Sequence, residues 1–229
     1  MLDFCEFLRN NTYPGRGIAV GRAADGTPVV YYFIMGRSVN SRNRIFCAEV
    51  DGIRTQAFDE DKVVDPSLII YHPVRAISQG LIVTNGNQTD TIRDAYAEGG
   101  DFRSACMTRR FEPDGPNFTP RISAMVYSGG GFEFSILKHG WGSPDQDGEL
   151  THVCNRQFFC YEDIAPGTMR FLSTYQGDGS PLPTFAGEPL EVSCPSPDEV
   201  WAALNADNKV SLYANVGGDV KLFNKHLGQ

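Results

Sequence analysis

The chain has 229 residues, 41% hydrophobic and 21% charged, which is ordinary for a globular protein with a substantial core. Its formal charge of −8 at pH 7 argues against a general nucleic-acid binder, because phosphate backbones are held by concentrated Lys and Arg. No apolar run approaches the roughly 20 residues that span a bilayer. The opening MLDFCEFLRNN has no basic region followed by an apolar stretch, so we expect no secretory signal and a cytoplasmic protein.

The six cysteines are scattered, without a C-x-x-C pair or the spacing of a zinc site. His152, Cys154 and Cys160 lie close in sequence but lack a second cluster, so we expect no metal site. Free thiols in a reducing cytosol are the better interpretation.

The first part of the chain predicts strands joined by tight turns. Asp25-Gly26 and Asp51-Gly52 are strong hairpin signals, each lying between runs rich in Val, Ile, Tyr and Phe. The run VVYYFI (29–34) is apolar at six consecutive positions, which predicts a strand covered on both faces. The strands expected here cover 17–22, 28–35, 45–50, 55–58, 68–77 and 81–85.

Two helices are expected next, over residues 89–100 and 101–111. The first starts with Thr or Asp and ends with a Gly pair, while the second has Asp101 as its N-cap. Arg109 and Arg110 are expected in the last turn of the second helix, where positive charge suits the dipole. The later elements expected are strands over 121–127, 132–137, 151–159, 210–216 and 219–224, a loop-rich section over 174–192 and a helix over 196–205.

The organisation of the chain predicts a single domain over residues 1–229. There is no internal repeat, and only the Pro/Gly-rich section 176–189 is a candidate boundary. Its aromatic and apolar residues predict an ordered loop wrapped on the body. Two strand-rich halves with a helical pair between them favour an α+β layered fold.

A polar turn, TNGNQTDTIRDA (84–95), lies where a strand passes into a helix. Helix starts attract anions, Gly86 lets the backbone approach a ligand, and Asn85, Thr89 and Thr91 offer neutral hydrogen bonds. Asp90 weakens a phosphate cradle because it is itself negative, although it could hold a ribose hydroxyl. Taken alone, an ordinary Asn-Gly turn with a helix cap is the more frequent interpretation.

Three arginines, Arg37, Arg42 and Arg44, crowd into GRSVNSRNRIF between two strands. Guanidinium forks match carboxylate and phosphate geometry, so this segment is a candidate anion site. A solvated basic turn explains the same pattern equally well.

Other candidates lie at the ends of predicted elements. Glu112 follows a helix and Arg121 opens the next strand, a pairing that most often is a surface ion pair. Tyr71 and His72 end an apolar run, and histidine is the usual general acid or base. None of these patterns decides a function alone.

Taken in order, five segments resemble the archaeal-type (PurO-like) IMP cyclohydrolase family: YPGRGIAVG, GRS with its Arg-rich turn, IIYHPVR, VTNGNQTDTI and TPRISAMV. The match covers roughly residues 13–127, and the later FLSTYQGDGSPLPTFAGEP resembles the longer bacterial members. The resemblance implies a four-layer αββα sandwich like that of N-terminal-nucleophile hydrolases. It also implies closure of 5-formamidoimidazole-4-carboxamide ribotide to IMP with loss of water, the last step of purine synthesis.

The resemblance further implies no metal or organic cofactor, a purine ribotide as the small-molecule partner, no nucleic acid, no membrane and a homo-oligomer. Counting without a gap from Arg37 places the family's catalytic arginine at Arg42, with Arg44 as the alternative. Tyr71 and Glu112 match its catalytic tyrosine and glutamate. The substrate-binding residues implied are Arg16, Arg37, Arg44, Asn85, Gly86, Thr89, Asp90, Thr91 and Arg121.

Two other functions stay open at this point: a non-catalytic purine-ribotide-binding protein and an amide hydrolase of the N-terminal-nucleophile class. Cys5 is rejected as an N-terminal nucleophile because it would first have to become residue one of a processed chain. Whether Tyr71 or Glu112 is the base, and whether a formyltransferase delivers the ribotide, also stay open.

Overall fold

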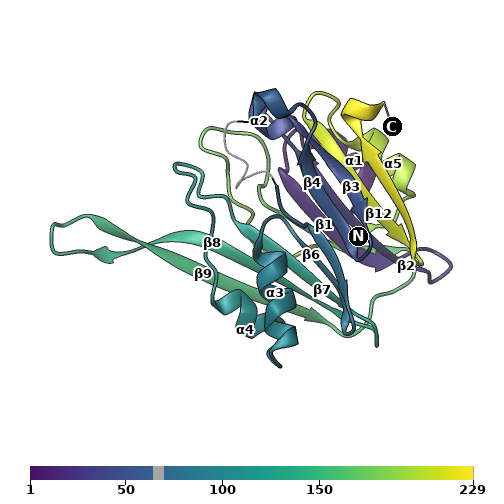
Figure 1. Cartoon of the computed structure of the whole chain (residues 1–229), viewed down its shortest axis with the longest axis horizontal. Coiled ribbons are helices and arrows are strands. Elements are labelled where there is room, and N and C mark those ends of the chain that lie inside the picture. Colours follow the sequence, from purple (N-terminus) through teal and green to yellow (C-terminus); the bar gives the residue numbers. More distant parts are fainter. Residues whose placement is uncertain (64–69, 229) are drawn as a thin grey trace.

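The computed structural model describes residues 1–63 and 70–228. Two antiparallel sheets and few helices give these residues an α+β fold, which confirms the expected class (Figure 1). In order across the first sheet, the strands are β11 (Leu190–Ser193), β10 (Thr168–Ser173), β1 (Arg16–Arg22), β2 (Pro28–Met35), β12 (Lys209–Val216) and β13 (Asp219–Asn224).

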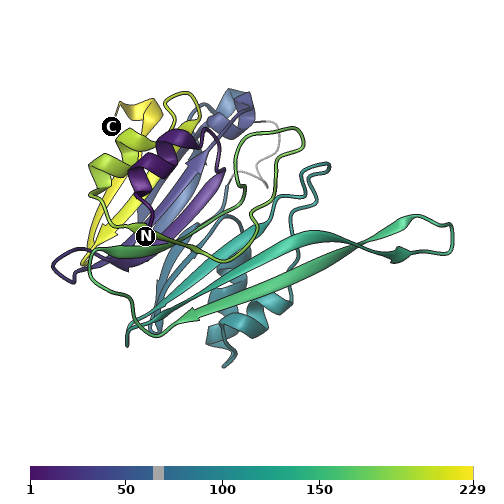
Figure 2. The ribbon, with the colours of Figure 1, turned by 180° about the vertical axis from the view of Figure 1, so that it is seen from behind.

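The second sheet follows the chain order from one edge to the other. In that order, its strands are β3 (Arg44–Glu49), β4 (Gly52–Ala57), β5 (Val74–Ile77), β6 (Gly80–Thr84), β7 (Arg121–Tyr127), β8 (Phe132–Pro144) and β9 (Leu150–Tyr161). Strands β8 and β9 form a long hairpin that projects beyond the rest of the molecule (Figures 1 and 2).

The two sheets pack on each other through apolar side chains. Ile18 and Ile34 of the first sheet share one buried cluster with Val83, Ile122 and Phe134 of the second. Fully burying a side chain of this kind contributes about 1.5–3 kcal/mol. The interface between the sheets is therefore the main core of the fold.

Strand β2 is covered on both faces, as its six apolar residues predict. Tyr32 and Ile34 point into the core between the sheets, whereas Tyr31 and Phe33 join the cluster on the other face. This follows from the two-residue period of a strand.

Helix pairs cover the outer faces of the two sheets. Helices α1 (Phe4–Asn10) and α5 (Pro197–Ala203) pack on the first sheet (Figure 2). Helices α3 (Gln88–Ala97) and α4 (Phe102–Met107) pack on the second (Figure 1). None of the helices in the described residues is both long and apolar enough to cross a membrane. The remaining helical turns are α2 (Val39–Arg42), η1 (Glu60–Lys62) and η3 (Lys225–Leu227).

The second central helix is shorter than predicted. Asp101 caps it, as expected, by accepting a hydrogen bond from the Ser104 backbone N–H. The helix ends at Met107, so the placement of Arg109 and Arg110 in its last turn was wrong. Tertiary contacts replace that turn, because Arg110 donates to the carbonyl of His152 on the projecting hairpin.

The strand expected over 68–77 is also shorter. Its first two residues lie outside the described residues, and the strand itself begins only at Val74. Pro73 has no N–H to donate to a ladder. Tyr71 instead donates its backbone N–H to the Thr55 hydroxyl at 2.9 Å, while its carbonyl accepts from the Thr55 backbone N–H.

The section expected to be loop-rich wraps on the body as an ordered loop, with Tyr175, Leu182 and Phe185 buried. Its last residues form part of strand β11, which was not predicted. The N-terminal helix α1, the turn α2 and strand β10 were also missed, because each is short and carries a weak periodic pattern.

One buried side chain bonds the two sheets together. Asn224 of β13 accepts from the Phe46 backbone N–H at 2.7 Å and donates to the Phe46 carbonyl at 3.1 Å. It also accepts from the Ser211 hydroxyl at 2.7 Å. The side-chain amide of Asn224 thus pairs with both backbone groups of Phe46, as a residue of a neighbouring strand would.

We predict that Asn224→Ala lowers the free energy of unfolding by about 2–4 kcal/mol, because two backbone groups of Phe46 lose their buried partner. Urea unfolding at pH 7 measures the change. The matched control, Asn155→Ala at an exposed position, should change stability by less than about 0.5 kcal/mol. Equal effects of the two substitutions would contradict the proposed link between the sheets.

Candidate active site

A pocket of about 290 Å³ lies where strand ends from both sheets meet. Arg16 begins β1 in the first sheet, Arg44 begins β3 in the second, and Glu112 lies in the loop before β7. The pocket lining also includes Tyr13, Arg37, Ser38, Asn40, Ser41, Asp114, Asn117, Thr119, Tyr175 and Leu182.

Arg44 is a buried cation, with only 1% of its surface exposed. Two backbone carbonyls hold its guanidinium group. Its Nε donates to the carbonyl of Ser41 in α2 at 2.9 Å, and its Nη2 donates to the carbonyl of Met35 at the end of β2 at 3.4 Å. Its Nη1 has no partner among the described residues. Burial, followed by the charge of Arg16, lowers the pKa of Arg44, yet an arginine keeps its proton in proteins.

Arg16 supplies a second, partly buried cation in the same pocket. Its Nε is buried and finds no hydrogen-bond partner in the described residues. Burial opposes its charge, but the negative charge of Glu112 and the neighbouring Tyr13 outweigh burial and raise the pKa of Arg16. Buried charges are costly unless paired, so these two guanidinium groups favour an anionic or strongly polar ligand.

Glu112 is the carboxylate that faces the arginines. Its side chain is 13% exposed, and its Oε1 lies 3.9 Å from Nη1 of Arg121. Burial raises the pKa of Glu112, while Arg16 and Arg121 oppose the increase. A carboxyl group with a raised pKa can exchange protons nearer neutral pH than a solvated one.

The polar turn after β6 reaches this site through Gly86. A Cβ added there would lie 2.6 Å from Nη1 of Arg121 and 3.4 Å from Oε1 of Glu112. The same Arg121 nitrogen donates to Oε1 of Gln88 at 2.7 Å. The absence of a side chain at Gly86 therefore lets Arg121 and Glu112 approach the backbone closely.

Asn85 and Thr89 hold the turn in place instead of lining the pocket. Asn85 donates to the Pro120 carbonyl at 2.8 Å and accepts from the Ile122 N–H at 2.9 Å. The Thr89 hydroxyl shares a 2.6 Å hydrogen bond with Thr84. Both side chains are buried and bonded within the protein.

Asp90 and Thr91 lie on the outer side of α3. Asp90 pairs with Arg75 at 2.9 Å and Arg93 at 3.1 Å. His72 also belongs to this surface cluster, 3.5 Å from Asp90. Thr91 borders a hollow between α3 and α4. The structure does not bring these residues together with the arginine pocket.

Tyr71 lies behind the pocket, almost fully buried. Its hydroxyl shares a 3.0 Å hydrogen bond with the hydroxyl of Tyr32. Tyr71 is one of the causes that favour the charged forms of Arg16 and Arg44, although it is not among the residues that line the pocket.

Arg42 and Arg44 have opposite surroundings. Arg42 is exposed, with its Nε donating to the Gly36 carbonyl and its Nη2 to Asn208. Of the two, Arg44 lines the pocket with Glu112, whereas Arg42 is not among the lining residues. Sequence spacing could not decide between them, because their directions depend on where α2 ends. Arg42 is the last residue of α2, whereas Arg44 is the first residue of β3.

Arg37 lies at the exposed rim of the pocket. Its guanidinium stacks over the Tyr13 ring at 5.0 Å and donates to Asp178 and to the Gly179 carbonyl. These contacts tie the rim to the loop after β10.

A hydrogen-bonded chain of pocket residues was missed by sequence reasoning. Asp114 accepts from the Thr119 backbone N–H at 2.6 Å and from the Thr119 hydroxyl. That hydroxyl shares a 2.6 Å bond with Tyr175, whose pKa burial raises to about 12. Tyr175 stands in the TYQGDG segment, but nothing in the sequence pairs it with Thr119.

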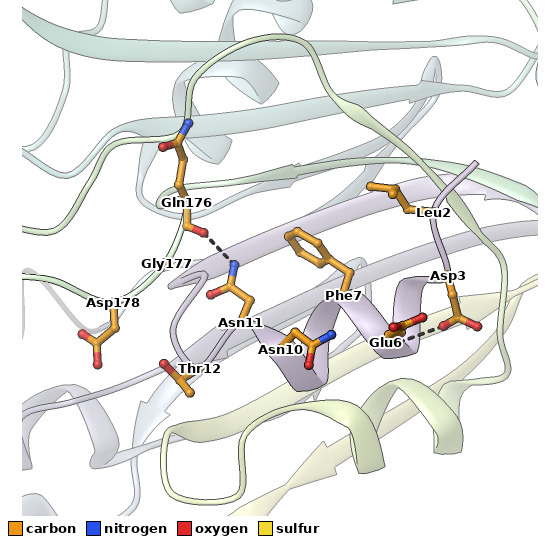
Figure 3. Close-up of a pocket in the computed structure, with 10 residues that line it drawn as sticks. All are labelled: Leu2, Asp3, Glu6, Phe7, Asn10, Asn11, Thr12, Gln176, Gly177 and Asp178. Atoms are coloured by element: carbon orange, nitrogen blue, oxygen red, sulfur yellow. Dashed lines mark hydrogen bonds between the residues drawn. The ribbon is translucent and has the colours of Figure 1, made fainter.

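A second pocket of about 520 Å³ lies beside α1 (Figure 3). Asp3, Glu6 and Asp178 contribute carboxylates, and Phe7 lies against its floor. This lining contains no Lys or Arg among the described residues, so the pocket suits an anionic ligand less well than the arginine pocket. The described residues also contain no cluster of three or more His, Cys, Asp or Glu arranged to hold a metal ion.

The arginine pocket defines a site for a small polar or anionic molecule, with the carboxylate of Glu112 in its lining. The chain belongs to the IMP cyclohydrolase-like protein family, whose family model matches residues 13–220.

Curated proteins similar to this chain carry the name IMP cyclohydrolase. The protein of Methanopyrus kandleri is 34% identical over 118 residues, which are 50% of this chain and 58% of that protein. The protein of Methanosphaera stadtmanae is 30% identical over 131 residues, 56% of this chain and 64% of that protein. The matched regions thus cover less than two thirds of the length of these relatives.

We predict that Glu112 makes stability decrease with pH relative to Glu112→Gln. Its pKa in the folded protein is raised above the ordinary 4.5, so the folded state binds this proton more tightly than the unfolded state. The stability of the wild type relative to the variant should fall as pH rises from about 4.5 through the raised pKa. The total decrease should be about 1.4 kcal/mol for each unit by which folding raises the pKa. Urea unfolding of both proteins between pH 4 and 8 measures this, and a wild type that gains on the variant with rising pH would contradict it.

Proposed function

We propose that this protein is an IMP cyclohydrolase that closes 5-formamidoimidazole-4-carboxamide ribotide to IMP and releases water. The family membership and the names of its relatives support this activity. The observation that carries the proposal is that Arg16 and Arg44, each with a buried nitrogen that lacks a hydrogen-bond partner among the described residues, line one pocket with Glu112.

The reaction needs a new C–N bond and the loss of one oxygen. The carboxamide nitrogen attacks the formyl carbon, and negative charge develops on the formyl oxygen. That oxygen then leaves as water, with one proton from the carboxamide nitrogen and one from the formamido nitrogen, as the C=N bond forms. The enzyme must therefore stabilise an oxyanion and move two protons.

Arg44 suits the first task, and we assign it the catalytic role expected of Arg42. A preorganised cation that already lacks a partner loses no existing bond when it binds the formyl oxygen. Arg16 lies in the same pocket and would share this charge.

Glu112 and Tyr71 suit the proton transfers. A carboxyl group with a raised pKa is matched to general base catalysis near neutral pH, so Glu112 would take the carboxamide proton. Tyr71 carries the hydroxyl that would donate a proton to the departing oxygen.

The remaining predicted residues divide into contacts and supports. Arg37 at the rim can reach a phosphate, while Arg121 and Gly86 fix the position of Glu112. Asn85 and Thr89 support the turn. Asp90 and Thr91 would act only through the stability of α3.

The fold supports the same family reading. The order of helices, first sheet, second sheet and helices corresponds to the four-layer αββα sandwich of N-terminal-nucleophile hydrolases. Because β2 belongs to both the outer and the inner core, we propose one domain for the whole chain. By analogy with the family we also propose a homo-oligomer, and the cytoplasmic location expected from the sequence stays a proposal.

The two alternatives have less support. Cys5 belongs to the buried face of α1 and does not line the arginine pocket, so an amide hydrolase would lack its nucleophile there. A purine-ribotide-binding protein without catalysis would bind IMP with no turnover, and it would not require Glu112 and Tyr71 beside the arginines.

We predict that Arg44→Gln lowers kcat by about 10²–10³-fold, the loss typical of one oxyanion donor. Arg42→Gln, the matched control at an exposed position, should change kcat by less than about threefold, because Arg42 only bonds Gly36 and Asn208. The absorbance change on conversion of the formamido ribotide to IMP measures both rates. A large loss for Arg42→Gln alone would return the catalytic role to Arg42.

We predict that kcat/KM rises with pH through an apparent pKa above 4.5, because Glu112 must lose its proton to act as the base. In Glu112→Gln this limb should vanish, with the remaining rate lower by about 10²–10⁴-fold. A wild-type rate that falls with pH over the same range would make Glu112 the acid instead.

A further inference from the structure

Tyr32 is a buried titratable group that the proposed mechanism has not yet used. It lies in the middle of β2 with 0% of its surface exposed. Its ring stacks on Phe46, with ring centres 5.6 Å apart. Its hydroxyl reaches the Tyr71 hydroxyl at 3.0 Å, which places a second phenol directly behind the proposed acid.

The neighbours of Tyr32 come from every side of the site. The positive charges of Arg16 and Arg44 favour the ionised form of Tyr32, but burial, which favours the neutral form, outweighs them. Burial, followed by the charge and the hydrogen bond of Tyr71, raises the pKa of Tyr32 well above its usual 10. Tyr32 therefore keeps its proton and can act as a permanent donor.

A buried tyrosine in a core needs a partner for its hydroxyl, and any nearby oxygen could serve. Tyr31, the preceding residue, shows this simpler arrangement, because its hydroxyl donates to the Pro195 carbonyl at 2.8 Å. Tyr32 points to the opposite face of the strand and bonds the hydroxyl of a residue proposed to be catalytic. The two tyrosines make an internal comparison on one strand.

We propose that Tyr32 is a positioning residue for the ring closure, whose hydroxyl orients Tyr71 and donates to its oxygen once Tyr71 has given up its proton. This inference rests on the proposed function. Hydrogen bonds to charged groups contribute about 1.5–3 kcal/mol, more than those between neutral groups. The benefit of Tyr32 would therefore be largest at the step where Tyr71 becomes a phenolate.

The first test is Tyr32→Phe, which removes only the hydroxyl. We expect kcat to fall about 10–100-fold, as expected for the loss of one donor to a charged oxygen, while KM changes less than about twofold. The pH dependence of kcat/KM should also change, because the oxygen of Tyr71 has lost its hydrogen-bond partner. Thermal unfolding and calorimetric binding of IMP establish that the variant is folded.

The control is Tyr31→Phe, the same chemical change one residue earlier, which should leave kcat within about twofold and the pH profile unmoved. A double-mutant cycle tests the route of the effect. In a Tyr71→Phe background, Tyr32→Phe should cost less than about twofold in kcat, because a residue acting through Tyr71 has nothing left to position.

The outcomes separate the two claims. Conversion by the wild type with an unchanged rate and pH profile in Tyr32→Phe would overturn the role of Tyr32 alone. If Tyr32→Phe lowered kcat by the same factor in the wild type and in the Tyr71→Phe background, the role of Tyr32 would also be overturned, since Tyr32 would then act without Tyr71. A folded wild type that does not convert the ribotide would overturn the proposed function and this inference with it.

Discussion

The meeting of two arginines, one partly and one fully buried, at the junction of the sheets is the constraint on which the site depends. Arg16 and Arg44 begin strands in different sheets, so their charges meet only because the sheets pack face to face. Water is largely excluded from them, and the carboxylate of Glu112 compensates only part of their charge. Electrostatic interactions in such an environment are stronger than in water, so the two guanidinium groups favour the binding of a polar or anionic ligand.

The apolar core and the polar site share the same strand. Alternate residues of β2 stabilise the outer and inner faces of the first sheet, and Tyr32 is the point where the inner face becomes polar. Packing against Phe46 holds its ring, so its hydroxyl has a fixed direction. Residues bonded within the fold, such as Asn85, likewise fix the turn that carries Gly86. Rigid surroundings of this kind maintain the geometry of groups that take part in catalysis.

Much of the fold could be predicted from residue patterns, because alternation and turn residues act over short distances. The turn at Asp25-Gly26 and the apolar run that follows it predicted the hairpin of β1 and β2, and the predicted strand 28–35 has the same bounds as β2. Elements whose ends depend on distant partners were placed less well. Helix α4 ends early where Arg110 bonds the projecting hairpin, and β5 begins late, after Pro73. Local propensity contains no information about such partners.

The sequence by itself determined the class of fold, the family resemblance and the residue types of the site, including Tyr71, Glu112 and an arginine after Arg37. Only the tertiary structure decided which arginine is buried. Arg42 and Arg44 are two residues apart, and the end of α2 directs one to solvent and the other into the pocket. Tyr32 and the Thr119–Tyr175 contact were likewise invisible, because their partners are 39 and 56 residues away and meet only through sheet packing.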